Sequence, residues 1–130
     1  MKFLQITLYF IGFVQAMLGL VFLIIPNQFA NSLGLAIPPV WVLWMFGNLG
    51  ARFLGFSIGM FVAAKNPSKH RDWILIMIFV QVIDWIYVMW HLIQQSVTLA
   101  QVATAPFFPV IFVAILGYYV LKNDLEVNSQ

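Results

Sequence analysis

The sequence contains no cysteine and few charged residues, and both shortages exclude classes of protein. Without cysteine the chain can form no disulfide, no thiolate nucleophile and no thiolate-bound metal. Charged side chains make up 8% of the 130 residues and hydrophobic ones 63%, and the mean hydropathy is +0.97. This composition is typical of an integral membrane protein. The net charge of +2 is too small and too scattered for nucleic-acid binding.

Four long apolar runs remain when the chain is divided at prolines, asparagines and charged clusters. They cover residues 3–25, 41–64, 73–95 and about 106–121. The first three exceed the roughly 20 residues that a helix needs to cross a bilayer, and the fourth is near the lower limit. We therefore expect a single all-α domain over residues 1–130, an integral membrane bundle of four transmembrane helices.

The basic residues predict how this bundle is oriented. Apart from Arg52, they lie at position 2, within residues 65–71 and at position 122, whereas residues 26–39 and 95–106 carry no charge. Cytoplasmic loops carry the excess of Lys and Arg. Both termini and the middle loop are therefore expected on the cytoplasmic side, and we expect the membrane to be the bacterial inner membrane.

Arg52, Asp84 and Gln15 are predicted to lie at one depth. Arg52 and Asp84 are each eleven residues from the outer end of their spans, about 16 Å at a rise of 1.5 Å per residue. An unpaired charge at the bilayer centre costs roughly 2.5 to 3.5 kcal/mol. We therefore expect an Arg52–Asp84 ion pair, with Gln15 or Gln81 taking up its remaining hydrogen-bond capacity.

Two interpretations of this pair remain open. A buried ion pair can fix the rotation of one helix against the next, whereas ionisable groups inside membranes also mark ligand or proton pathways. In the second case the layer forms a polar pocket, and its further lining residues are expected to be Gln15, Asn48, Gln81 and His91.

Small residues recur on the same helical faces as these polar residues. Because glycine lets helix backbones approach closely, such faces are expected at helix contacts. The predicted packing residues are Gly12 and Gly19 in the first span and Gly47, Ala51, Gly55 and Gly59 in the second.

Three segments carry a family resemblance: GARFLGFSIG (50–59), KNPSKHRDW (65–73) and QVIDW (81–85). With them the chain resembles the DoxX-like group of small four-helix membrane proteins, and more closely its BphX-like branch. The resemblance covers most of the chain in length, number of spans and the arginine of the second span. It implies a compact bundle with Arg52 at a family-typical position. Some members of that group are associated with redox or quinone-linked membrane complexes, and the group offers no catalytic motif to carry over.

His91 is the only histidine within a span and the main candidate for contact with a cofactor. Its position would suit a haem ligand, a quinone hydrogen-bond donor or a proton relay, and equally an interfacial histidine bonded to a loop carbonyl. The neighbouring aromatic residues Trp85, Tyr87 and Trp90 could line a quinone or simply pack against lipid. We expect no metal site and no bound cofactor, with quinone or haem contact as the alternative.

The inventory of side chains does not favour an enzyme, because no nucleophile has an adjacent base and the loops are short. The favoured function is an accessory or scaffolding subunit of a larger membrane complex, which is redox- or quinone-linked if the resemblance holds. The alternative is a small-molecule binding protein or dimeric transporter whose pocket contains Arg52, Asp84 and His91. The expected partners are lipid and other membrane subunits or further copies of the chain.

Overall fold

The computed structural model describes the backbone of residues 2–128 and the side chains of residues 2–122, and every regular element in this part is helical. Three helices are long and apolar enough to cross a membrane: α1 (Lys2–Ile24), α3 (Val40–Lys65) and α4 (Arg71–Ile93). The apolar part of α6 (Phe108–Asn128) is shorter and covers Phe108–Lys122. The all-helical fold is thus confirmed, and three of the four predicted spans have the length and apolarity to cross a membrane, while the fourth span stays a prediction.

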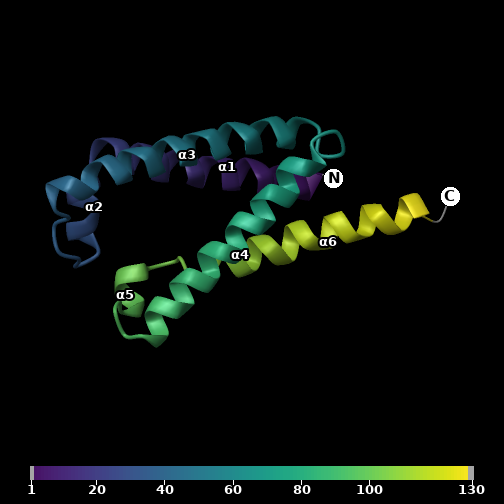
Figure 1. The fold of residues 1–130 in the computed structure, drawn as a ribbon. Coiled ribbons are helices and arrows are strands. Elements are labelled where there is room, and N and C mark those ends of the chain that lie inside the picture. The colour runs from purple at the N-terminus through teal and green to yellow at the C-terminus, as the bar shows by residue number, and fades with distance from the viewer. Residues whose placement is uncertain (1, 129–130) are drawn as a thin grey trace.

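The long helices form two hairpins (Figure 1). One consists of α1 and α3, which run side by side along their length, and the other of α4 and α6. Both termini and the α3–α4 connection lie at one end, which we call the terminal end. The short helices α2 (Pro26–Ser32) and α5 (Leu99–Val102) lie at the opposite end, which we call the loop end.

The first hairpin is held by a close approach of two backbones. A Cβ atom added at Gly50 would lie 2.8 Å from the carbonyl oxygen of Gly19, and one added at Gly19 would lie 2.9 Å from the carbonyl oxygen of Gly50. No larger residue fits there, so glycine at both positions sets the spacing of α1 and α3. Gly12 makes a similar contact with the ring of Phe61.

The buried core lies near the terminal end. It draws on the beginning of α1, the last part of α3, the first part of α4 and the first and middle turns of α6. Its fully or nearly fully buried members are Leu4, Leu8, Ile11, Met60, Ala63, Ala64, Ile74, Met77, Phe112, Leu116 and Val120. None comes from the loop-end halves of α3 or α4, and the two hairpins separate in that direction (Figure 1).

The loop end contains two short helices where the sequence indicated uncharged connections. Pro26 occupies the first turn of α2, where its missing N–H is not needed. Thr98 and Gln101 form a capping box around α5. The Nε2 atom of Gln101 also donates to the carbonyl oxygen of Gly34 at 3.3 Å, which joins the two loops across the hairpins.

Candidate functional site

Arg52 and Asp84 lie on the faces of α3 and α4 that are turned toward each other. The two helices touch where Gly59 packs against the ring of Trp73. Arg52 precedes Gly59 by seven residues, which is about two helical turns, and Asp84 follows Trp73 by eleven residues, about three turns. Both side chains therefore project from the continuation of the contact faces, toward the loop end.

The ion pair expected between Arg52 and Asp84 is not formed. Within the described part of the chain neither side chain makes a hydrogen bond or an ion pair, and both are exposed. The cause is the divergence of α3 and α4 beyond the Gly59–Trp73 contact, which separates the two side chains although their faces are turned toward each other. Neither Gln15 nor Gln81 bonds to this pair; both are engaged elsewhere.

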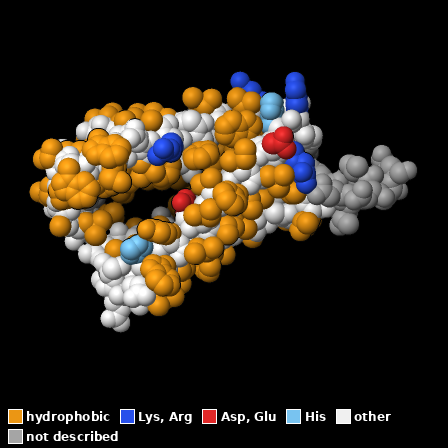
Figure 2. Space-filling model, in the orientation of Figure 1, with side chains coloured by type: hydrophobic (Ala, Val, Ile, Leu, Met, Phe, Trp, Pro, Cys, Tyr) orange, Lys and Arg blue, Asp and Glu red, His pale blue; other side chains and the backbone are white. Residues whose placement is uncertain are grey.

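The divergence leaves a hollow between the hairpins (Figure 2). We call it the inter-hairpin hollow: the space between α3 and α4 on the loop-end side of Gly59 and Trp73. Basic, acidic and histidine side chains appear around it among mostly hydrophobic ones. The hydrogen bond from Gln101 to Gly34 joins the hairpins at its far end, so the hollow is bounded at both ends and open at the side.

Gln15 and Gln81 meet at a methionine that the sequence analysis did not single out. Both glutamines are almost fully buried, with exposed fractions of 4% and 5%. Their Nε2 atoms point at the Sδ atom of Met77, at 4.0 Å from Gln15 and 3.6 Å from Gln81. Thioether sulfur is a weak acceptor, and the buried Oε1 atom of Gln15 has no hydrogen-bond partner.

We expect Gln15→Leu to raise the free energy of unfolding by about 1–3 kcal/mol, because a buried oxygen without a partner carries its full desolvation penalty. The hydrogen bond lost in exchange is the long one to Met77. Circular dichroism during SDS titration in mixed micelles would measure the change. Gln94→Leu, at an exposed position, should leave stability unchanged. A loss of stability in Gln15→Leu would contradict this account.

His91 lies in the last turn of α4, where the loop that follows the helix turns back so that Ser96 contacts it. Its Nδ1 atom lies 2.7 Å from the Oγ atom of Ser96, and that hydroxyl donates to the carbonyl oxygen of His91 at 3.1 Å. Because the hydroxyl proton is used there, the ring nitrogen is the donor, which leaves Nε2 as the acceptor in the neutral ring. The ring of Tyr87 lies edge-on at 4.9 Å between centroids. The partner of His91 is thus a loop hydroxyl, where the sequence analysis offered a loop carbonyl.

The small residues of α3 have three kinds of surroundings. Gly59 is buried against Trp73, and Gly50, which the sequence analysis overlooked, packs on α1. Gly47 and Gly55 instead face open space, because a Cβ atom added at either would meet nothing within 4 Å. Ala51 and Asn48 share this side of the helix and are exposed. We call the surface formed by Gly47, Asn48, Ala51, Arg52 and Gly55 the open face of α3.

Comparisons of the chain with protein-family models, curated proteins and solved structures found no match. Among the described residues no group of three His, Cys, Asp or Glu side chains is placed to hold a metal ion.

Proposed function

We propose that the chain is an accessory or scaffolding subunit of a larger membrane assembly, with four spans and both termini on the cytoplasmic side. The supporting observation is the open face of α3, which combines a charged residue without a partner with small residues that no part of the described chain covers. The resemblance to DoxX-like proteins, some of which are associated with redox or quinone-linked complexes, points to the same kind of role.

The energetic argument starts from Arg52. An arginine at mid-depth costs roughly 2.5 to 3.5 kcal/mol when it faces hydrocarbon unpaired, and within the described chain Arg52 has no hydrogen bond or ion pair. A partner helix that brings a carboxylate or carbonyl groups to the open face would offset this cost. The same argument applies to Asp84 on the other side of the inter-hairpin hollow.

The shape of the open face suits a helix as the partner. Helices associate in membranes chiefly through van der Waals packing and interhelical hydrogen bonds, both of which improve where small residues let backbones approach. Gly47, Ala51 and Gly55 are four residues apart, so they form one row along α3 beside Arg52. Partner helices on this face would also cover Trp41 and Trp44, which are about two-thirds exposed.

The orientation follows from the charges. Lys2, the basic segment 65–71 and Lys122 all belong to the terminal end, whereas residues 26–39 and 95–106 at the loop end are uncharged. By the positive-inside rule the terminal end is the cytoplasmic one. We place the protein in a bacterial inner membrane.

The test is native mass spectrometry of the protein extracted from its own membrane in mild detergent. We expect it to co-purify with another membrane subunit, and Arg52→Leu and Gly55→Leu each to reduce this co-purification by about tenfold or more, since both remove features of the docking face. Gly117→Leu is the matched control, because Gly117 lies on α6 and an added Cβ there also meets no neighbour. A monomer, or an assembly of identical chains alone, would contradict an accessory role.

The inter-hairpin hollow favours a second candidate, a small-molecule binding protein or dimeric transporter. Arg52 and Asp84 stand on opposite sides of it, and neither has a partner among the described residues; His91 lies two turns beyond Asp84. A small polar molecule with groups of both charges could bridge them. Extraction of the chain with such a molecule bound, and loss of that molecule in Asp84→Asn with folding intact, would establish this function in place of the first.

A further inference from the structure

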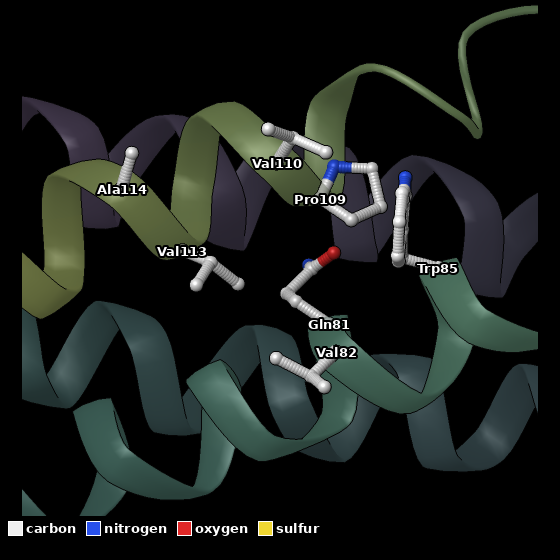
Figure 3. Close-up of a pocket in the computed structure, with 7 residues that line it drawn as sticks. All are labelled: Gln81, Val82, Trp85, Pro109, Val110, Val113 and Ala114. Carbon is white, nitrogen blue, oxygen red and sulfur yellow. The ribbon is translucent and has the colours of Figure 1, made fainter.

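A separate cavity lies between α4 and α6 (Figure 3). It has a volume of about 460 Å³ and is lined by Gln81, Val82 and Trp85 from α4 and by Pro109, Ala114 and two valines from α6. Neither Arg52, Asp84 nor any other charged residue lines it. Its size falls within the range of small-molecule sites in proteins, which are concave and mostly apolar with a few polar groups.

Gln81 supplies the polar group of this cavity. Its side chain is 95% buried, and its carboxamide lies between the two helices, near the ring of Pro109 and beside Trp85 (Figure 3). The Nε2 atom donates to the Sδ atom of Met77 at 3.6 Å, and no described residue donates to the Oε1 atom. An acceptor without a donor in apolar surroundings costs free energy, and a ligand that brings a donor removes this cost.

The remaining surface of the cavity selects against charge. Apart from Gln81 the lining consists of aliphatic side chains, a proline ring and the indole of Trp85. A charged headgroup placed there would lose its hydration without gaining a counter-ion. A hydrocarbon part would gain close packing against the valines and the indole ring.

From this combination we propose that the cavity binds an uncharged, apolar molecule that carries one hydroxyl group and enters from the lipid phase. Its hydroxyl donates to the Oε1 atom of Gln81, and its hydrocarbon part lies along Trp85 and the valines of α6. The cavity lies between two apolar helices of the second hairpin, so a molecule dissolved in the bilayer reaches it without crossing water. This site does not depend on the proposed function, because none of its lining residues belongs to the open face of α3.

Trp85 makes the proposal testable by fluorescence quenching. The probe is 2-bromododecan-1-ol, whose bromine is next to the hydroxyl and so lies near Trp85 when the hydroxyl is at Gln81. Its partner without a hydroxyl is 2-bromododecane, and each is titrated into the purified chain in mild detergent. Bromine quenches indoles at short range, and subtracting the signal of Trp85→Phe removes the contribution of the other four tryptophans. We expect the alcohol to quench Trp85 saturably at about tenfold lower concentration than the bromoalkane, the ratio that one net hydrogen bond gives.

Variants separate recognition by Gln81 from simple partitioning into the micelle. Gln81→Leu should make the two probes equivalent, since no acceptor remains in the cavity. Ala114→Phe should fill the cavity and abolish saturable quenching by either probe, whereas Ile111→Phe, at an exposed position of α6 outside the lining, should leave it intact. This second pair still tests the site should Gln81→Leu fail to fold.

Three results would overturn the proposal. They are equal quenching of the unaltered chain by the two probes, the absence of a component specific to Trp85, and persistence of saturable quenching in Ala114→Phe. None of them affects the co-purification experiment, so the two proposals fail independently.

Discussion

Gly50→Leu is expected to separate α1 from α3 and to lower the free energy of unfolding by about 1–3 kcal/mol or more. Even the first side-chain atom would lie 2.8 Å from the carbonyl oxygen of Gly19 and 2.8 Å from the Cγ atom of Leu23. The obstacle at Gly19 is backbone, which cannot turn aside as the end of a flexible side chain can. The whole helix must therefore shift, and the close packing of the hairpin is lost with it.

The matched control for this change is Gly55→Leu. It adds the same side chain to the same helix, but at a position where nothing lies within 4 Å of the added Cβ. Unfolding of the purified chain, followed by circular dichroism as SDS is added to mixed micelles, should show a large loss in Gly50→Leu and little change in Gly55→Leu. Equal losses of stability would contradict the assignment of Gly50 to the side of α3 that packs on α1 and of Gly55 to the side that faces open space.

Met77→Ala is the second change expected to have a large effect, with a loss of about 2–5 kcal/mol in the free energy of unfolding. Met77 is fully buried in the core at the terminal end, where both hairpins contribute side chains. Truncation leaves a void and deprives the buried Nε2 atoms of Gln15 and Gln81 of the sulfur they point at. Both terms act in the same direction.

Met77→Leu separates these two terms. Leucine keeps most of the volume of methionine but offers no acceptor. The packing change alone is expected to cost less than about 1.5 kcal/mol. Any further loss of stability in Met77→Leu measures what the two contacts to sulfur contribute. Combining Met77→Leu with Gln15→Leu should recover part of that cost, because one of the two stranded amides is then gone. The same unfolding titration measures all three variants. If Met77→Ala were as stable as the unaltered chain, this description of the contact between Met77 and the two glutamines would be refuted.

The helices themselves could be predicted from the sequence, because apolar runs of this length have few alternatives in a membrane. The first three predicted spans agree with α1, α3 and α4 to within a few residues. The short helix α2 was not predicted. Its seven residues are too few to show a hydrophobic period, and only Pro26 signals the first turn.

For the candidate site, the facing direction of Arg52 and Asp84 was predictable from the sequence but the distance between them was not. Residue counts predict one level for Arg52 and Asp84, which stays a prediction, and helical phase turns the two residues toward each other. Whether the two side chains meet depends on how far apart the helix axes lie, and no periodic pattern within one helix encodes that separation. The contact of Gly59 with Trp73 fixes the spacing at one point, and the helices diverge beyond it.

Gly50 and Met77 show two further limits of prediction from the sequence. Gly50 lies outside the row of small residues spaced by four, so the pattern selected the neighbouring face of α3 and missed the glycine that packs on α1. Met77 looked like one more apolar residue among many. Its sulfur matters because of Gln15, which is 62 positions away in the chain and belongs to another helix.

The first hairpin is more densely packed than the second, and this difference sets the order in which the helices can assemble during synthesis. The dense contact between α1 and α3 involves only residues 2–65, so this hairpin can be complete while α4 is still inside the ribosome. The core at the terminal end, in contrast, needs Phe112, Leu116 and Val120 of α6, which is made last. Until α6 arrives, α4 is held only by its short contact with α3 and by the packing of Met77 against α1. During that interval the polar faces around the hollow are open to whichever neighbour in the membrane reaches them first.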